Sequence, residues 1–181
     1  AKLDLSLNYR RGTGAFDSLP APEEAFGEGT SRPKITSVEA QLNAPFSLGE
    51  QRLRYNGTWR VQYNGTQLVP QDRFAIGGRY TVRGFGGESQ LSAEHGWLIR
   101  NDLSFALEEA GQELYLGADY GQVGGPTSQT LVGTRLSGAV LGLRGSAKGF
   151  SYDVFVGQPI HKPSGFKAAD GVAGFSVNLS S

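Results

Sequence analysis

Few residues of this chain could carry out covalent chemistry. Ser92, His95 and Asp102 are the residue types of a hydrolytic triad, but no Gly-x-Ser-x-Gly turn presents a serine, and a triad is defined by geometry rather than composition. His95 and His161 are the only histidines and fall in different predicted loops, so they do not indicate a metal site. We therefore expect no catalytic residue, no bound metal and no other cofactor.

Composition narrows the function further. The 181 residues suit one domain or part of a larger one. The chain has no cysteine, which excludes thiol catalysis, zinc-thiolate sites and disulfide scaffolds. The run Gly145–Gly149 lacks the spacing of a nucleotide-binding P-loop. Seventeen basic residues balance seventeen acidic ones, so nucleic acid is not indicated as a partner.

The most distinctive segment is the glycine-dense run Gly77–Glu88, which lies within a long predicted loop, 68–95. Loops of this length in compact domains are usually functional or disordered. This loop also carries apolar side chains that need a surface to pack against: Phe74, Ile76, Tyr80, Val82 and Phe85. The pattern predicts an insert held in a cavity, with Arg83 placed for a specific partner. The alternative is an ordinary solvated arginine.

The elements that would position this loop are strands. Apolar and polar residues alternate along the chain and predict eight strands and no helix. The alternation continues through Asn56 and Gly57, which favours one long third strand over a hairpin. The predicted strands are Leu3–Tyr9, Val38–Phe46, Leu53–Tyr63, Trp97–Leu107, Leu114–Tyr120, Ala139–Leu143, Phe150–Val156 and Ala173–Leu179.

The connections between these strands alternate in length. Short turns are predicted near 47–50, 108–111 and 146–149. Long loops cover Gly12–Pro33, Leu68–His95, Gly124–Thr134 and Pro159–Asp170. This asymmetry is typical of outer-membrane barrels, and strands of about ten residues are long enough to cross a bilayer. We therefore predict an all-β fold, a transmembrane antiparallel β-barrel.

The polar faces of the strands support a barrel over a soluble sandwich, which would also alternate. They combine glycines with charges of both signs, which a wide wet lumen tolerates, whereas the surface strands of soluble proteins favour Thr, Lys and Glu. Asp119 alternates with Leu116, Ala118 and Tyr120 and therefore shares this inward parity. If it faced lipid instead, its charge would cost roughly 2–4 kcal/mol near the midplane. By the same parity, arginine is expected to block insertion at Leu116 and to be better tolerated at Gly117. The predicted lumen-lining charges are Arg52, Arg54, Arg60, Arg100, Asp102 and Arg144.

Two motifs carry a resemblance to a known family. The sequence Val82-Arg83-Gly84-Phe85 resembles the loop signature of two-partner secretion transporters of the TpsB type. The sequence Gly117-Ala118-Asp119-Tyr120-Gly121 resembles that family's second signature, which places an aspartate on the inner barrel wall. The resemblance covers essentially the whole chain, residues 1–181, as the C-terminal eight strands of a sixteen-stranded barrel. The family's POTRA domains, its plug helix and the N-terminal half of the barrel are absent from this sequence.

The resemblance implies a function and a site. It implies an outer-membrane translocator that secretes a large partner exoprotein, an adhesin or cytolysin, and that contacts outer-membrane lipid without nucleotide or nucleic acid. It also implies a lumenal salt bridge between Arg83 and Asp119. The alternatives are an assembly insertase of the same superfamily, a passive diffusion channel and a soluble ligand-binding barrel.

Overall fold

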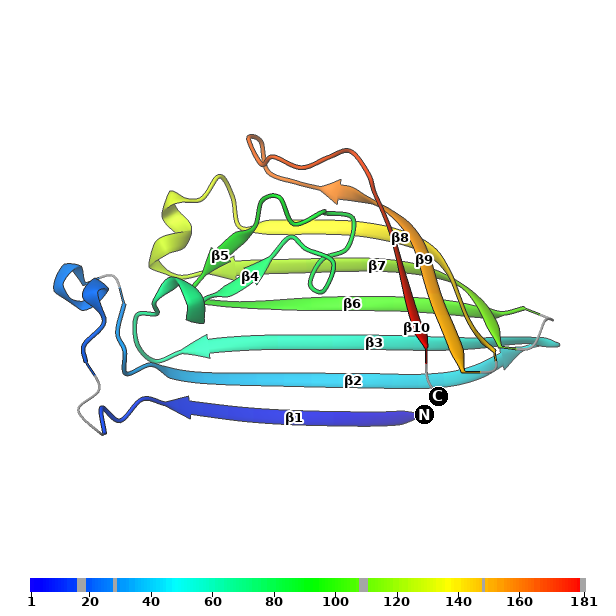
Figure 1. The fold of residues 1–181 in the computed structure, drawn as a ribbon, viewed down its shortest axis with the longest axis horizontal. Helices are drawn as coiled ribbons and strands as arrows, with labels where there is room; N and C mark the ends of the chain where they lie inside the picture. Colours follow the sequence, from blue (N-terminus) through cyan, green and yellow to red (C-terminus); the bar gives the residue numbers. More distant parts are fainter. Residues whose placement is uncertain (16–18, 28, 108–110, 148, 180–181) are drawn as a thin grey trace.

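The computed structural model describes residues 1–15, 19–27, 29–107, 111–147 and 149–179. Most of these residues form one eight-stranded antiparallel sheet of order β1-β2-β3-β6-β7-β8-β9-β10 (Figure 1). Its strands are β1 (Lys2–Arg11), β2 (Lys34–Leu48), β3 (Gln51–Asn64), β6 (His95–Ala106), β7 (Gln112–Gly124), β8 (Arg135–Ala147), β9 (Phe150–His161) and β10 (Val172–Leu179). The predicted all-β antiparallel architecture and its eight main strands are thus confirmed.

Strand β3 tests the most ambiguous part of the sequence pattern. It runs without a break through Asn56 and Gly57, and it pairs with β2 on one side and β6 on the other. The prediction of one long strand is therefore correct. The Asn-Gly pair does not turn the chain because ladder partners on both sides, Asn43 and Asp102 for Asn56, hold the backbone extended.

The long loop contains structure that the sequence did not predict. Two short strands, β4 (Phe74–Ile76) and β5 (Leu91–Ala93), pair with each other inside the segment 68–95. Three residues are too few for alternation to be recognised. The remaining elements are short 3-10 turns, η1 (Pro22–Phe26), η2 (Pro70–Asp72) and η3 (Pro126–Thr130). Among the described residues, no helix has the length and apolar character to cross a membrane.

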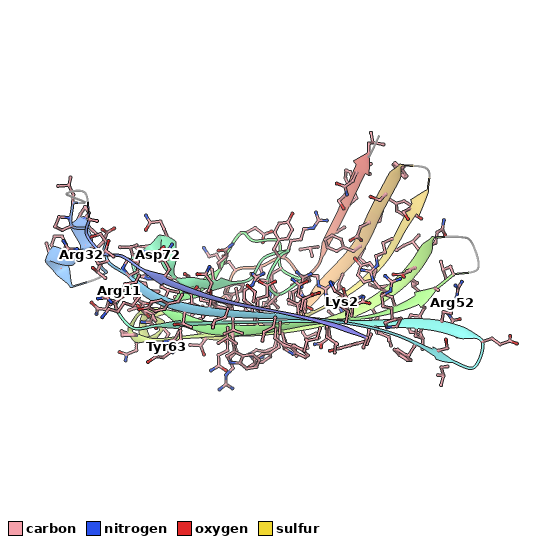
Figure 2. The ribbon with its side chains drawn as sticks, turned by 90° about the horizontal axis from the view of Figure 1, so that it is seen from below. Lys2, Arg11, Arg32, Arg52, Tyr63 and Asp72 are labelled. Atoms are coloured by element: carbon pink, nitrogen blue, oxygen red, sulfur yellow. The ribbon has the colours of Figure 1, made fainter. Side chains whose placement is uncertain are left out.

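The short turns and long loops lie at opposite ends of the strands (Figure 1). Residues 108–110 and 148, within two of the predicted short turns, lie outside the described residues. The sheet also curls, so that β8, β9 and β10 rise from the plane of β1–β3 on the side that carries the long loop (Figure 2). The concave side of the sheet is therefore the side that holds the loop.

The two faces of the sheet differ as the alternation predicts. Side chains on the convex face are large, apolar and exposed: Leu5 is 71% exposed and Phe175 73%. In water this exposure would be unfavourable by about 25 cal/mol for each Å² of apolar surface, whereas contact with lipid removes that cost. Other exposed residues of this face are Leu3, Leu7, Leu116, Leu141, Val154, Val156 and Val177.

The hydrophobic core lies on the concave face, beneath the long loop. Ile76, Val82 and Phe85 of the loop are almost fully buried there. The residues that surround them are Phe74, Leu91, Ala93, Leu98, Val123, Leu136 and Phe166. The predicted need of the loop for a supporting surface is thus met by the barrel wall, with one exception: Tyr80 is 77% exposed.

Two neighbouring residues of β2 test the assignment of the faces. Leu42→Arg is expected to prevent stable insertion, because an outward arginine near the midplane costs roughly 2–4 kcal/mol. Gln41→Arg is the matched control, since Gln41 lies at the same depth, points to the concave side and contacts Glu39. The measurement is the amount of heat-modifiable, folded full-length protein in the outer-membrane fraction. Equal losses for both variants would contradict the assigned faces.

Candidate functional site

The tip of the long loop lies directly against the inner wall of the sheet. Gly84 has a φ of +98°, which favours glycine, and a Cβ atom there would overlap the Gln158 carbonyl of β9. A Cβ atom at Gly138 of β8 would overlap the Arg83 carbonyl oxygen. The β8–β9 register shifts at Ser137/Gly138, beside this contact. Glycines on both the loop and the wall therefore permit the close approach.

At this point Arg83 and Asp119 are joined by three hydrogen bonds. The Arg83 Nε–H donates to Asp119 Oδ2 at 2.7 Å, and Nη2 donates to Oδ1 at 2.7 Å. The backbone N–H of Arg83 donates to Oδ2 at 2.9 Å. This is a bidentate guanidinium–carboxylate fork with an additional backbone donor, the strongest class of protein hydrogen bond. The side chains are 7% and 0% exposed, so the pair is closed off from water.

Two further charges complete the cluster. Asp102 Oδ1 lies 2.6 Å from Arg83 Nη2, in a contact of opposite charges whose geometry is not that of a hydrogen bond. Arg100 Nε lies 3.8 Å from Asp119 Oδ2. Two cations thus face two carboxylates, and the cluster is formally neutral. Burial by itself would lower the pKa of Arg83, but the hydrogen bonds and negative charge of Asp119, and then the negative charge of Asp102, raise it, so the guanidinium remains charged.

Apolar contacts hold the loop on both sides of the ion cluster. The Phe85 ring meets the Phe166 ring edge-on, with centroids 5.8 Å apart. The Arg79 guanidinium lies 4.9 Å from the centroid of the Phe155 ring on β9, within the range of a cation–π contact. The loop is therefore attached to β7 by charge, to β9 by a cation–π contact and to the last long loop by aromatic packing.

Two of the other predicted lumenal charges, Arg54 and Arg144, form a second network toward the short-turn end. Arg54 and Arg144 both bind Glu113, at 2.7 Å and 3.0 Å, and Arg144 also donates to Ser104 Oγ at 2.6 Å. This network borders a hollow of about 850 Å³ on the concave face. Arg52 also lines the hollow and has no ion pair among the described residues.

The carboxylates of these pairs were not among the predicted site residues. Glu113 binds two arginines, and Glu39 Oε2 accepts from Arg60 Nε at 3.2 Å. The hydrogen bond from the Tyr115 hydroxyl to Asp153 was not predicted either. The alternation along the strands could have indicated these residues, because it places each of them on the inward face.

The remaining chemical candidates are separated. His95 Nδ1 lies 3.1 Å from Asn64 Oδ1, while Asp102 faces Arg83, so the residue types of a triad do not converge with Ser92. Within the described ranges, no three His, Cys, Asp or Glu side chains are placed to hold a metal ion.

Comparison with known proteins gives consistent matches. A sequence model of the family described as "Haemolysin secretion/activation protein ShlB/FhaC/HecB" matches residues 1–145. The outer membrane transporter CdiB-2 of Burkholderia pseudomallei is 41% identical over 181 residues, covering 98% of this chain and 31% of that protein. The outer membrane transporter CdiB of Dickeya dadantii is 28% identical over 132 residues, covering 71% and 24%. The chain therefore spans less than a third of the length of these relatives.

A solved structure shares the fold. CdiB from Escherichia coli matches with a TM-score of 0.79 at 20% sequence identity, over 98% of this chain and 33% of that one. At this identity the match establishes the fold alone.

The lumen beside Gly117 is already occupied. A Cβ atom at Gly117 would lie 2.6 Å from both Arg83 Nη2 and Asp102 Oδ1. The docked loop therefore opposes an arginine at Gly117, and its better tolerance there than at Leu116 stays a prediction.

Arg83 and Asp119 are expected to act as one unit. Arg83→Ala and Asp119→Ala should each release the loop, because breaking a buried pair leaves the partner uncompensated at a cost of about 3–5 kcal/mol. The double variant should be no worse than the more affected single variant. Release is measured as protease sensitivity of the loop in equal amounts of folded full-length protein. Additive losses would show that the two residues work separately.

The glycine contact gives an independent prediction. Gly138→Ala is expected to reproduce the defect of Arg83→Ala while both charges remain, because the new methyl group displaces the Arg83 backbone. Gly171→Ala is the matched control, since its nearest contact would be 3.4 Å from a carbonyl oxygen, an ordinary separation. Protease sensitivity of the loop in purified full-length protein measures release. An unchanged loop in Gly138→Ala would contradict the close approach.

Proposed function

The chain belongs to the ShlB/FhaC/HecB family of haemolysin secretion/activation proteins, and from that premise we propose that it is the C-terminal half of a barrel that secretes a large partner exoprotein across the outer membrane. The relationship to secretion transporters expected from the two motifs is confirmed, as is the outer-membrane location. The relatives are transporters, in agreement with the expectation that the protein is not an enzyme.

The observation that carries this proposal is the locked position of the loop on the inner wall. The buried fork between Arg83 and Asp119 spans from the loop to β7, and the loop tip reaches β8 and β9. A permanently open diffusion channel would have no use for a charged, buried lock across its own lumen. A protein-conducting channel needs such a constriction, because it must stay closed to small solutes between export events.

The polar wall below the loop supports passage of an unfolded chain. The inward arginines Arg54, Arg60 and Arg144 are each paired with a carboxylate, so the wall is wet and polar but holds little net charge. A polypeptide of mixed sequence would meet weak contacts that it can leave again. No nucleotide is required, since folding of the exoprotein outside the cell supplies the driving force.

The partner is proposed to be an adhesin or a cytolysin, and the family description in terms of haemolysin secretion favours the cytolysin class. The competing function is insertion of other barrels into the outer membrane, which shares the loop signature. The two functions differ in what is lost when the loop fails: one exoprotein, or many outer-membrane proteins.

Deletion of Val82–Phe85 from the full-length protein separates these functions. We expect secretion of the exoprotein to be lost and single-channel conductance in planar bilayers to rise, with unchanged levels of unrelated porins in the outer membrane. Deletion of residues 23–26, none of which is buried, is the control of equal length. A general fall in porin levels would identify an insertase, and unchanged conductance would contradict the proposed constriction.

A further inference from the structure

Charged residues are almost absent from the outward face of the sheet. Among the described outward positions of the eight strands, the Asp, Glu, Lys and Arg residues are Arg11, Lys34 and Arg135. All three are basic, and all three lie at strand ends that lead into long loops. Among the described strand residues, the opposite end of the outward face has no such charge. Outer-membrane barrels have long extracellular loops and short periplasmic turns, so the basic residues lie on the side of the outer leaflet.

Arg11 and Lys34 stand directly opposite each other on β1 and β2. Both are exposed, and neither has an ion pair within the described part of the chain. Like charges in this cross-strand position repel and destabilise the sheet. The neighbouring residue Arg10, which points inward, differs from this pair in that it forms a salt bridge with Asp72. The outward pair therefore carries two positive charges that the chain itself does not neutralise.

Aromatic residues indicate where the Arg11–Lys34 pair lies relative to the membrane. Two residues along the strands from this pair, toward the middle of the sheet, Tyr9, Thr36 and Tyr63 lie side by side in register. All three face outward. On β6 and β7, the Trp97 and Tyr120 rings pack against each other, tilted by 36° and with centroids 5.1 Å apart. Such a belt marks the boundary between acyl chains and headgroups. Arg11 and Lys34 lie just beyond it, at the headgroup level.

Figure 2 shows the same arrangement across the sheet. Arg11 and Tyr63 lie at the long-loop end, and Tyr63 projects from the side opposite to Asp72. Lys2 and Arg52 lie toward the other end.

We propose that Arg11 and Lys34 form a binding site for the phosphate groups of lipopolysaccharide, the phosphorylated glycolipid of the outer leaflet. A guanidinium binds phosphate through two parallel N–H donors, and an ammonium adds a compact charge. The neighbouring tyrosines present apolar rings to the acyl chains and hydroxyls to the sugars. The bound phosphates would neutralise the cross-strand repulsion and fix the β1–β2 hairpin in the membrane.

The test uses the full-length protein in detergent and native mass spectrometry with defined lipids. The probes are bisphosphorylated lipid A, the same lipid without phosphates, phosphatidylglycerol and inorganic phosphate. Arg11→Gln combined with Lys34→Gln removes the site while keeping polar side chains at exposed positions. Lys2→Gln combined with Arg52→Gln removes the same charge elsewhere. Heat-modifiable migration confirms that each variant is folded.

We expect wild-type protein to bind bisphosphorylated lipid A and to lose roughly 25-fold in affinity in the Arg11/Lys34 variant, from about fivefold for each basic residue near an anionic surface. The control variant should stay within about twofold of wild type on the same scale. Removal of the lipid phosphates should weaken binding as much as removal of the cations. Equal binding by the Arg11/Lys34 variant, or displacement of lipid A by phosphatidylglycerol or inorganic phosphate, would overturn the proposal.

Discussion

The buried guanidinium of Arg83 is the constraint on which the inner side of this sheet depends. A charge that is 7% exposed needs carboxylates at fixed distances, and here they come from two neighbouring strands, Asp119 on β7 and Asp102 on β6. Arg100 adds the fourth charge that keeps the cluster neutral. Because paired strands fix these positions relative to each other, the sheet offers one place where the loop can dock.

The same constraint explains the small residues on the wall. Gly117 and Gly138 leave the space that the Arg83 side chain and backbone occupy, and the Gly121 side of β7 receives Ile76 and Val82. In a strand of a soluble sheet, glycine weakens packing and lowers β propensity. Here the missing side chains are replaced by the loop, so the wall and the loop complete one packed layer between them.

Alternation predicted the strands and their faces because lipid on one side and a lumen on the other impose opposite polarity at every step. It also placed Asp119 inside, and the family motifs pointed to its partner, Arg83. Alternation did not reveal β4 and β5, which are too short to show a period. Nor did it show that Gly117 faces a filled space or that Tyr80 is exposed, since both depend on how a loop from elsewhere in the chain folds back. Glu39 and Glu113 were predictable by parity, yet only the register across strands identifies which arginine each one binds.

The strength of the lock bears on the proposed export. Freeing the loop would return the charges of Arg83 and Asp119 to water and would expose Val82 and Phe85, at roughly 1.5–3 kcal/mol each. The apolar exposure alone places the released state at least about 3 kcal/mol above the locked one, which is a population of under roughly one molecule in a hundred. On the proposed function, an exoprotein that binds the released lumen supplies the missing energy. The locked loop is then the closed state between export events, and the paired charges around Glu113, away from the apolar core, line the path that opens.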